Sequence, residues 1–411
     1  MPPNVLHLST YDTNGGAARA AYALHRAMVD SGLPSRMKVA ARTVEDPTVT
    51  GGSSLRFRAA SLADRQLWRL QKSPVQTWRS PAQFGSLSAS EINQSGADVV
   101  NLHWVTDGFL SVREIGRITK PIVWSLYDMW PFAGTEHYGT DTPDARWRSG
   151  YTAANRPADE SGVDLDRRTW EAKRQAWVRP MHMVPASTWL ADRVGQSALM
   201  ATWPTTRIPH VIDTDSFAPM DRAEARRALG LPEDRPVILF LASAGITDQR
   251  KGFDLLDQAL PAVRQRHPDA TVMVVGPLAA GYQASAGTPI SWRGSIAGDA
   301  ALRLHYCAAD VTAVPSREDN MPLTAMEAQS CGTPVVAFGI GGLPDIVSHQ
   351  QTGYLASPFD LDQLAEGLVQ ALDDSAHDRN WSRTARERAL STWSRPVVVE
   401  RYQQLYEDAL R

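Results

Sequence analysis

The sequence has very little cysteine. Its two cysteines, Cys307 and Cys331, form no C-x-x-C pair and show no metal-ligand spacing. A chain with this pattern is expected in a reducing compartment, so we expect a cytoplasmic protein. Long apolar runs are also missing, because none approaches the ~18 residues of a membrane-spanning helix. The start, MPPNVLHLSTYDTNGG, lacks the charged and apolar regions of a signal peptide, so no such peptide is expected.

Positive charge is not in excess either. The formal net charge is −3, whereas nucleic-acid binders usually carry a basic domain, so no nucleic-acid partner is expected. The sequence shows no internal repeat at a fixed period and no low-complexity tract. What it does have is 411 residues, 43% of them hydrophobic, which is enough for two domains with their own cores.

Both halves of the chain alternate apolar strands with helical segments. The first half has candidate strands at 4–9, 97–105 and 121–130, and a helical run that stops at Gly32. The second half repeats the pattern from about Arg235. Its candidate strands are PVILFLAS (236–243), DATVMVVGP (269–277), DVTAVPS (310–316) and TPVVAFG (333–339). The fold class we predict is therefore α/β, with two Rossmann-like, doubly wound domains.

The domain boundary is expected in the Pro-rich, polar stretch 205–225. We predict an N-terminal domain at 1–207 and a C-terminal domain at 208–394. Residues 395–411 have apolar positions at spacings of four, three and four, which predicts an amphipathic closing helix that returns to the first domain.

The stretch SREDNMPLTAMEAQSCGTPVVAF (316–338) joins a polar loop, a short helix and a strand. Asn320 is a good N-cap, Pro322 is tolerated in a first turn and Gly332 ends the segment, which predicts a helix over about 322–330. The N–H groups and positive dipole end of such a helix suit a phosphate or diphosphate. Glu327, further along, offers a carboxylate to hydroxyl groups. Diphosphate and hydroxyls together describe a sugar nucleotide.

These motifs carry a resemblance. The second half, from RKGFDLLDQAL (250–260) through the 316–338 stretch to TGYLASPFDLDQLAEGL (352–368), resembles the retaining glycosyltransferases of family four, which have the two-domain GT-B fold. In the first half, STYDTNGGAARAAYALHRAM (9–28), VVNLHWV (99–105), PIVWSLYDMWPFAG (121–134) and VPASTWLADRVGQSALM (184–200) resemble bacterial members that build exopolysaccharide, capsule or O-antigen. The resemblance covers nearly the whole chain.

The resemblance implies roles for the basic residues. Lys251, with Arg250 beside it, would neutralise the donor diphosphate and stabilise the leaving group. Family members usually carry another Arg six residues before that Lys, where this chain has Gly245. This departure puts the second phosphate contact in doubt.

The resemblance also implies the remaining donor contacts. Asp319 and Glu327 keep the family's spacing of two acids with seven residues between them, so Asp319 or its neighbour Glu318 would approach the sugar and Glu327 would bind the ribose. Residues expected to hold sugar, phosphate or base are Asn320, Met321, Pro322, Leu323, Gly294 and Ile296. Gly15 and Gly16 would allow close approach of the first domain's backbone. His103 is as well explained as a hydrogen-bonded core histidine as by a place in the site.

A further departure concerns the family signature His-Asp-Met-Trp-Pro-Phe. Here the segment begins Tyr127-Asp128. We predict that Tyr127 narrows the choice of donor sugar without acting as a general base, and that Asp128 orients the site. A Tyr packed under the strand end, away from the sugar, is the alternative.

Two other motifs have competing interpretations. Asp213 and Asp215 copy the Asp-x-Asp that binds a divalent cation in another glycosyltransferase fold, but they fall in the expected hinge, so no metal and no cofactor are predicted. Residues 56–79 hold six basic side chains, one acid and two tryptophans. They predict either a peripheral membrane contact, at the inner face of the membrane, or a solvated basic helix.

The resulting prediction is a metal-independent retaining transferase. It would move a hexose-type sugar from a nucleoside-diphosphate-sugar donor to a glycan or lipid-linked acceptor, by front-face attack in a cleft between the domains. A hydrolysing sugar-nucleotide epimerase on the same fold and a non-catalytic glycan or nucleotide binder remain alternatives. A Rossmann dehydrogenase fits less well, because TNGGAARA (13–20) lacks G-x-G-x-x-G.

Overall fold

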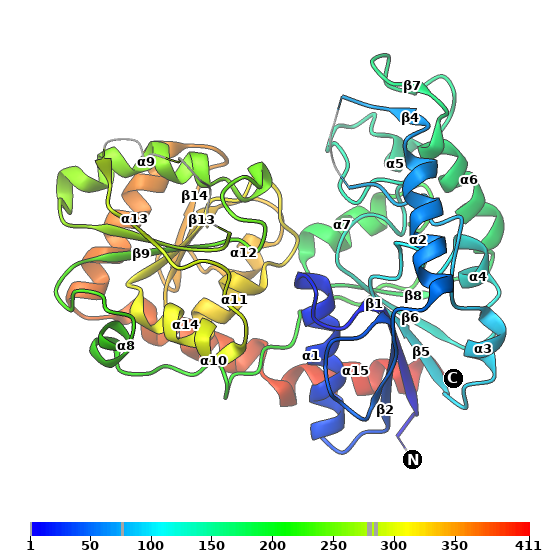
Figure 1. Cartoon of the computed structure of the whole chain (residues 1–411), viewed down its shortest axis with the longest axis horizontal. Coiled ribbons are helices and arrows are strands. Elements are labelled where there is room, and N and C mark those ends of the chain that lie inside the picture. Colours follow the sequence, from blue (N-terminus) through cyan, green and yellow to red (C-terminus); the bar gives the residue numbers. More distant parts are fainter. Residues whose placement is uncertain (1, 75–77, 278–281, 283–286) are drawn as a thin grey trace. The chain divides into compact units, whose positions relative to one another are not determined.

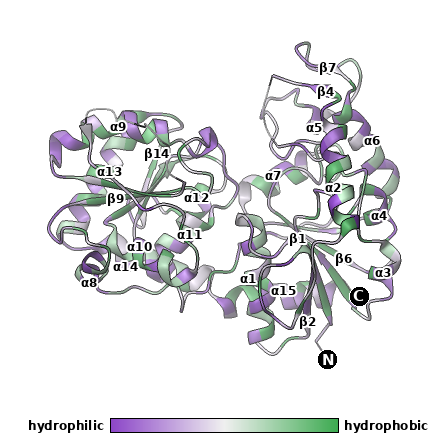
Figure 2. Ribbon diagram, viewed as in Figure 1, coloured by the Kyte–Doolittle hydropathy of each residue, from purple (hydrophilic) through white to green (hydrophobic). Residues whose placement is uncertain are grey.

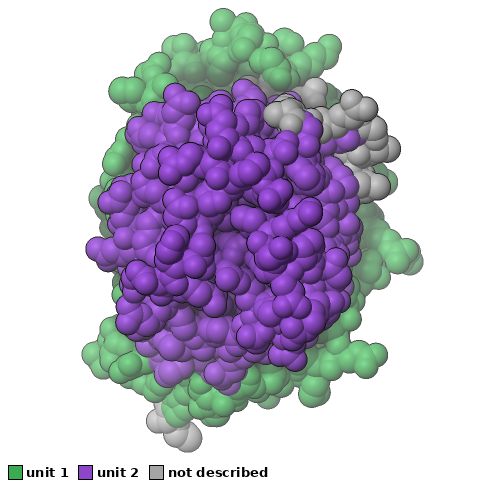
Figure 3. Space-filling model, turned by 90° about the vertical axis from the view of Figure 1, so that its left-hand side faces the viewer, with its two compact units in different colours: residues 1–209, 399–411 green, residues 210–398 purple. Residues whose placement is uncertain are grey.

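The computed structural model describes residues 2–74, 78–277, 282 and 287–411. By contact, these fall into two compact units (Figure 3). The N-terminal unit comprises 1–209 and 399–411, and the C-terminal unit comprises 210–398. The boundaries expected at 207/208 and 394/395 remain predictions of where independent domains begin and end.

The N-terminal unit is built on a six-stranded parallel sheet with the order β3-β2-β1-β5-β6-β8. Its strands are β1 Val5–Tyr11, β2 Ser35–Ala41, β3 Val49–Gly51, β5 Val99–Leu102, β6 Ile122–Leu126 and β8 His182–Pro185. A short antiparallel pair, β4 Gln71–Lys72 and β7 Ser161–Gly162, lies outside this sheet. Its helices are α1 Gly16–Asp30, α2 Leu55–Trp68, α3 Ala89–Asn93, α4 Val112–Gly116, α5 Arg146–Ser149, α6 Leu165–Ala176 and α7 Thr188–Gln196.

The C-terminal unit repeats the design, with the parallel strand order β11-β10-β9-β12-β13-β14. Its strands are β9 Val237–Leu241, β10 Thr271–Val275, β11 Ile290–Trp292, β12 Val311–Val314, β13 Val335–Phe338 and β14 Gly353–Ala356. Its helices are α8 Arg222–Ala228, α9 Phe253–Arg266, α10 Asp299–Ala308, α11 Leu323–Ser330, α12 Leu343–Ile346, α13 Leu361–Ala376 and α14 Asn380–Thr392. Helices α9 and α13 cover one face of the sheet, and α8, α10, α11 and α14 cover the other (Figure 1).

Burial of both sheet faces explains the apolar runs in the sequence. Every residue of β5, β6, β12 and β13 is buried, as expected for parallel strands covered by helices on both sides. The hydropathy colouring shows the same concentration of apolar residues along the strands (Figure 2). The predicted fold class, two doubly wound α/β domains, is confirmed.

The closing helix is α15 Arg395–Asp408. Its part within the N-terminal unit is anchored by two buried phenols. Asn101 Nδ2 of β5 donates to the Tyr406 hydroxyl at 2.8 Å, and the Tyr402 hydroxyl lies 2.9 Å from the Ser125 hydroxyl of β6. The predicted return of the C-terminal helix to the N-terminal domain is therefore confirmed.

One local prediction was wrong. Helix α11 begins at Leu323, and its N-cap position is Pro322, with ψ 120°, and not Asn320. Pro322 itself makes no side-chain cap hydrogen bond. The reason for the difference is that Pro322 has the extended backbone of an N-cap residue, so the helix begins after it and Asn320 lies two residues before the cap position. The predicted end at Gly332 agrees with φ +73° there.

Within the described part of the chain, no helix is long and apolar enough to cross a membrane. Of the basic stretch 56–79, residues 75–77 lie outside the described residues. Helix α2 makes up most of the rest and buries Phe57, Ala60, Ser61 and Asp64, at spacings of three, one and three residues.

Candidate functional site

The C-terminal sheet has a topological switch point between β9 and β12. The chain proceeds outward from β9 to β10 and β11, then returns to β12 and proceeds the other way to β13 and β14. In open α/β sheets, ligands bind beyond the carboxyl ends of the strands at such a point. Lys251 follows β9 and Asp319 follows β12, so the topology alone brings these two predicted site residues to the same place.

Lys251 and Asp319 form an ion pair at this point. The Lys251 ammonium Nζ donates to Asp319 Oδ2 at 2.7 Å, and the guanidinium of Arg250 lies 3.7 Å from the same oxygen. Ser316 Oγ donates to it as well, at 3.3 Å. Burial alone would raise the pKa of the Asp319 carboxyl, but the charges of Lys251 and Arg250 outweigh it and hold that pKa below its ordinary value. Asp319 is therefore an ionised carboxylate whose charge is matched by two cations.

Backbone contacts hold the loops that carry these side chains. Arg317 N–H donates to Arg250 C=O at 2.8 Å, and Gly342 N–H donates to Asp319 C=O at 3.1 Å. Gly252, with φ +71°, allows the closest approach, because a Cβ there would lie 1.9 Å from the Pro315 carbonyl oxygen. The loop after β9 and the loop after β12 can meet only if residue 252 has no side chain.

The start of α11, at Leu323, follows Asp319 by four residues. The first-turn N–H groups of an α-helix have no partner in the helix ladder, and the N-cap residue Pro322 makes no side-chain hydrogen bond to them. Helix α9, which directly follows Lys251, likewise begins at Gly252 without a side-chain cap. By contrast, α8 and α13 in the same unit are capped by aspartates. Helix starts whose N-cap residues supply no capping side chain, together with two nearby cations, suit the binding of a diphosphate.

The predicted residues Asn320, Met321 and Pro322 are buried in the turn that leads into α11, and Leu323, its first residue, is partly exposed. Glu318 is partly exposed, and its carbonyl accepts from Arg250 Nη1 at 3.1 Å. These residues thus surround the ion pair. Their contacts with a donor remain predictions.

Glu327 lies on α11 and is 2% exposed. Its Oε2 accepts a hydrogen bond of 2.8 Å from the Tyr306 hydroxyl of α10. The sequence did not indicate a site role for Tyr306, because a tyrosine within an apolar helix pattern is most simply a core residue. This hydrogen bond fixes one oxygen of the carboxylate that we predict to bind the ribose.

The other predicted C-terminal residues lie at the same edge of the sheet. Gly294 follows β11 and its carbonyl accepts from Gly276 N–H, which follows β10, at 2.9 Å. Ile296 lies two residues further on and is partly exposed. His210, which sequence reasoning missed, is near enough for the Asp319 charge to affect it. Burial nevertheless lowers the pKa of His210 to about 4, so it is neutral at pH 7 and adds no positive charge.

The backbone at Gly245 explains why this chain lacks the arginine that family members usually carry there. Gly245 has φ +76°, a conformation that side-chain-bearing residues rarely adopt, and a Cβ there would lie 2.8 Å from the Pro277 carbonyl oxygen. An arginine is therefore not accommodated at this position without a shift of the backbone.

The N-terminal unit has a switch point of its own, between β1 and β5. Gly15 and Gly16 follow β1 at the start of α1, and a Cβ built on either meets nothing within 4 Å. His103 follows β5, and Tyr127 follows β6. The predicted residues of the first half are therefore gathered at the carboxyl edge of their own sheet.

His103 and Tyr127 are directly bonded. The Tyr127 hydroxyl lies 2.8 Å from His103 Nδ1, and His103 Nε2 lies 2.9 Å from His7 Nδ1. Burial raises the pKa of Tyr127 well above its ordinary value and, with the neighbouring His103, lowers that of His7 well below it. The phenol is therefore protonated at neutral pH. Both ring nitrogens of His103 have hydrogen-bond partners, and the roles of His103 and Tyr127 in the site remain predictions.

Asp128 organises the turn after β6. Its Oδ1 accepts from Trp130 N–H at 3.0 Å and its Oδ2 is 2.6 Å from His137 Nδ1. His137 Nε2 in turn lies 2.8 Å from Ser80 Oγ. Asp128 is only 8% exposed, and all of these contacts lie within the N-terminal unit.

The Asp-x-Asp sequence forms a turn. Asp213 Oδ1 accepts from the N–H groups of Asp215 and Ser216, both at 3.1 Å, and its Oδ2 accepts from Ser216 Oγ at 2.8 Å. Among the described residues, no three or more His, Cys, Asp or Glu side chains are grouped so that they could hold a metal ion.

Comparison with known proteins agrees with this geometry. Residues 235–374 match the family model described as glycosyl transferases group 1. A D-inositol 3-phosphate glycosyltransferase of Actinosynnema mirum is 36% identical over 209 residues, covering 43% of this chain and 48% of that protein. One of the same name from Nocardiopsis dassonvillei is 27% identical over 347 residues, covering 80% and 75%. The Anabaena protein HepE, solved in complex with UDP-glucose, superposes with a TM-score of 0.66 at 15% identity, covering 98% of this chain and 99% of that one.

These similarities define the class. Residues 235–374 resemble the glycosyl transferases group 1 family, and the fold of the chain is that of the GT-B glycosyltransferases. The matched region of this chain spans about half of the first relative's length, 48%.

Proposed function

We propose that this protein is a retaining glycosyltransferase. It would transfer a hexose-type sugar from a nucleoside-diphosphate sugar to a glycan or glycolipid acceptor in cell-surface polysaccharide synthesis. The observation that carries the proposal is the Lys251–Asp319 ion pair of 2.7 Å close to the start of α11, whose N-cap residue, Pro322, makes no side-chain cap. Its relatives' names, which include inositol-phosphate glycosyltransferases and a GDP-mannose-dependent mannosyltransferase, support transfer of a sugar to a polar acceptor.

The diphosphate would bind against Lys251, Arg250 and the N–H groups at the start of α11. As the bond to the sugar breaks, negative charge grows on the departing phosphate, and these groups are already oriented toward it. Before the donor arrives, the Asp319 carboxylate balances the positive charge of Lys251. On donor binding, the three N–H groups of the Lys251 ammonium would be divided between hydrogen bonds to Asp319 and hydrogen bonds to the phosphate.

Asp319 would orient the sugar and would not attack it. Its carboxylate is ionised and bonded to Lys251 and Ser316, which reduces its strength as a nucleophile. The leaving phosphate would then accept the proton of the attacking acceptor hydroxyl on the same face of the sugar ring, so that the configuration is retained. Glu327, held by Tyr306, would accept hydrogen bonds from the ribose.

The proposal includes metal independence. Charge on the diphosphate would be offset by two side-chain cations and a helix start, which perform the task that Mg²⁺ or Mn²⁺ performs in other transferases. The Asp213 carboxylate is already used by its own turn.

A nucleotide panel tests the proposal. The melting temperature would be measured with UDP, GDP, ADP and TDP and with their sugars. A nucleotide at about 100 times its Kd adds roughly 2.7 kcal/mol to the stability of the unit that binds it, so one base should raise the melting temperature by several degrees. No response to any nucleotide contradicts the proposal.

Product analysis on the preferred donor then separates the related activities. A transferase forms a glycoside only when acceptor is present. Turnover of the donor sugar without any acceptor would indicate an epimerase, and binding without a product for any acceptor would indicate a glycan or nucleotide binder. The cytoplasmic location remains a prediction, as does the membrane contact of 56–79. Leu62, an exposed residue of α2, and the exposed Arg58 support that contact.

A further inference from the structure

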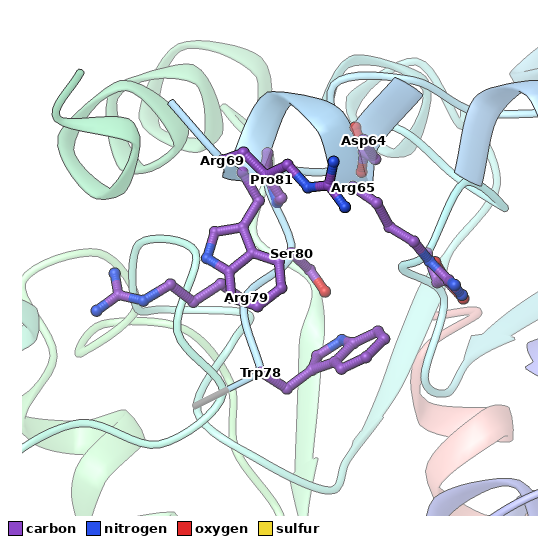
Figure 4. A pocket seen from close by; sticks show the side chains of 9 residues that line it. Asp64, Arg65, Arg69, Trp78, Arg79, Ser80 and Pro81 are labelled. Carbon is purple, nitrogen blue, oxygen red and sulfur yellow. The ribbon is translucent and has the colours of Figure 1, made fainter. Parts of the chain in front are cut away.

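A further cavity, of about 250 Å³, lies in the N-terminal unit. It forms where the end of α2 meets the segment 78–81 and the loop after β5. Two tryptophans and three arginines line it, together with Asp64, Ser80, Pro81 and Asp107. Figure 4 shows the side chains of Arg65 and Arg69, from α2 and its end, above Trp78.

The charges of two of the three arginines are already matched. Arg65 donates to both oxygens of Asp107, from Nε at 3.1 Å and from Nη2 at 2.9 Å. Arg79 is buried and pairs with Asp166 and with Glu160, the latter at 3.2 Å. These two guanidinium groups are structural, because each neutralises a buried carboxylate and so shapes the wall.

Arg69 is different. Among the described residues it has no carboxylate partner, and its one hydrogen bond goes to the amide oxygen of Gln66 at 3.1 Å. It is exposed and follows the last residue of α2. Its guanidinium therefore offers planar, paired N–H donors to an anion, the geometry that carboxylates and phosphates match.

The tryptophans give the cavity its second property. Trp78 is 48% exposed, an unusual exposure for so large an aromatic ring, and Arg65 supports it with its guanidinium carbon 5.7 Å from the ring centroid. Trp68 lines the same cavity. A tryptophan face offers flat apolar surface and its edge offers an N–H donor. A pyranose ring has the matching combination, with C–H groups on its faces and hydroxyls at its rim.

The size and the lining exclude other ligand classes. The volume is below the roughly 300–1,000 Å³ of ordinary small-molecule pockets, so it suits a single sugar unit and not a long chain. Three arginines disfavour a cation, and the density of charged groups disfavours an acyl chain.

We propose that this cavity binds an anionic sugar, whose carboxylate or phosphate pairs with Arg69 and whose ring stacks on Trp78. Within the proposed function, this is the acidic group of the glycan or glycolipid acceptor, and that assignment rests on the proposed transfer activity. The binding itself does not, because it needs neither donor nor transfer.

The test is ligand binding to the full chain without nucleotide, by saturation-transfer NMR and calorimetry. The probes are glucose 6-phosphate, glucuronate, glucose and inorganic phosphate. Arg69→Met removes the charge and keeps the apolar stem, Trp78→Ala removes the ring, and Arg56→Met is the matched control on the exposed part of α2. Equal melting temperatures and equal nucleotide binding establish that each variant is folded.

We expect glucose 6-phosphate, glucuronate or both to bind at least tenfold more tightly than glucose and more tightly than inorganic phosphate. Which of the two binds better identifies the acidic group. Arg69→Met should remove that preference by about tenfold or more, Trp78→Ala should weaken every sugar probe, and Arg56→Met should change nothing. Binding that persists when transfer activity cannot be detected supports the cavity and counts against the proposed function alone.

Several results would overturn the proposal. These are equal affinity for glucose and the anionic sugars, no binding of any probe, or equal losses in Arg56→Met and Arg69→Met. Vesicles containing about one third anionic phospholipid provide a further arm. If they bind the protein through Arg69 and Trp78 while the sugar probes do not bind, the surface is a membrane contact and the sugar site is rejected.

Discussion

Replacing Lys251 by methionine should affect donor binding and folding stability separately, and the structure indicates how much of each to expect. Methionine keeps most of the apolar stem and removes the ammonium group. If Lys251 binds the diphosphate, its loss removes one charge-assisted contact, worth on the order of 1.5–3 kcal/mol. The Kd for the preferred nucleoside diphosphate should therefore rise roughly tenfold to a hundredfold.

The same substitution leaves Asp319 with a weaker partner. Breaking a fully buried ion pair costs about 3–5 kcal/mol. Here the Lys251 side chain is 19% exposed and Arg250 remains 3.7 Å from the carboxylate. We therefore expect a smaller loss, about 1–3 kcal/mol, because both water and Arg250 still compensate the charge.

The contribution of Asp319 to folding stability depends on pH, and the direction of its pKa shift determines how. The pKa of Asp319 is lowered in the folded protein, so its stabilising contribution is present above the ordinary carboxyl pKa and is lost as the pH falls through the lower, folded value. Without Lys251 the folded pKa rises toward the ordinary one. The acid side of the stability curve should then move to higher pH in Lys251→Met.

Calorimetric titration with the nucleotide and guanidinium unfolding at several pH values measure both effects. Arg227→Met is the matched control, because Arg227 makes an exposed ion pair with Glu233 at 3.1 Å in the same unit. It should cost less than about 1 kcal/mol and leave Kd unchanged. An unchanged Kd in Lys251→Met, with the variant folded, would refute the assignment of this lysine to the diphosphate.

Further outcomes follow from the same geometry. Transfer should proceed in excess EDTA, and activity that is lost in EDTA and restored by Mn²⁺ would instead favour a cation held by Asp213. Glu327→Gln should raise the Kd for the nucleotide about tenfold, whereas Tyr306→Phe, which removes only the supporting hydrogen bond, should raise it less; equal values for wild type and Glu327→Gln argue against ribose binding. Tyr127→Phe and Tyr127→His should change the ranking of kcat/KM across sugars on the preferred nucleotide, and an unchanged ranking with unchanged rates would make Tyr127 structural.

The fold was predictable because burial on both sheet faces leaves a strong pattern. Strands such as β12 and β13 are continuous apolar runs bounded by polar or Gly/Pro residues, and helices between them keep a three-to-four spacing. Because strands and helices alternate along the chain, the strands are expected to pair in parallel. That the sites lie at strand ends was predictable for the same reason, since a parallel sheet collects its loops at one edge.

The pairings within the site were not predictable from local pattern. Lys251 and Asp319 are far apart in sequence and meet only because β9 and β12 are adjacent in the sheet. The bond from Tyr306 to Glu327 links two helices, α10 and α11, and neither residue type identifies its partner. The N-cap prediction at Asn320 was wrong for a local reason. Residue preference favours Asn as a cap, but the extended ψ of 120° at Pro322 moves the helix start to Leu323.

In the N-terminal unit the apolar strand pattern predicted where the candidate site residues lie but did not indicate what they do. His103 and Tyr127 were expected at strand ends, but their mutual hydrogen bond and the contact to His7 depend on three adjacent strands. The cavity beside α2 was hidden for another reason. Its tryptophans and arginines belong to a stretch with a poor apolar period, where a solvated helix and a binding surface have the same composition.

The glycine at 245 decides how the proposed diphosphate site must be built. Its left-handed backbone and the Pro277 carbonyl 2.8 Å from a Cβ leave no room for the usual arginine. The available cations are then Lys251 and Arg250, which lie side by side on one 3-10 turn, Gln249–Lys251. Because both approach the same Asp319 oxygen, removing one frees the other to compensate, and their effects on donor binding should not add. The loss in a double variant should therefore exceed the sum of the two single losses in a calorimetric double-mutant cycle, because no cation is left to compensate. A strictly additive result would mean that the two cations contact the donor independently, and that the ion pair with Asp319 is not what couples them.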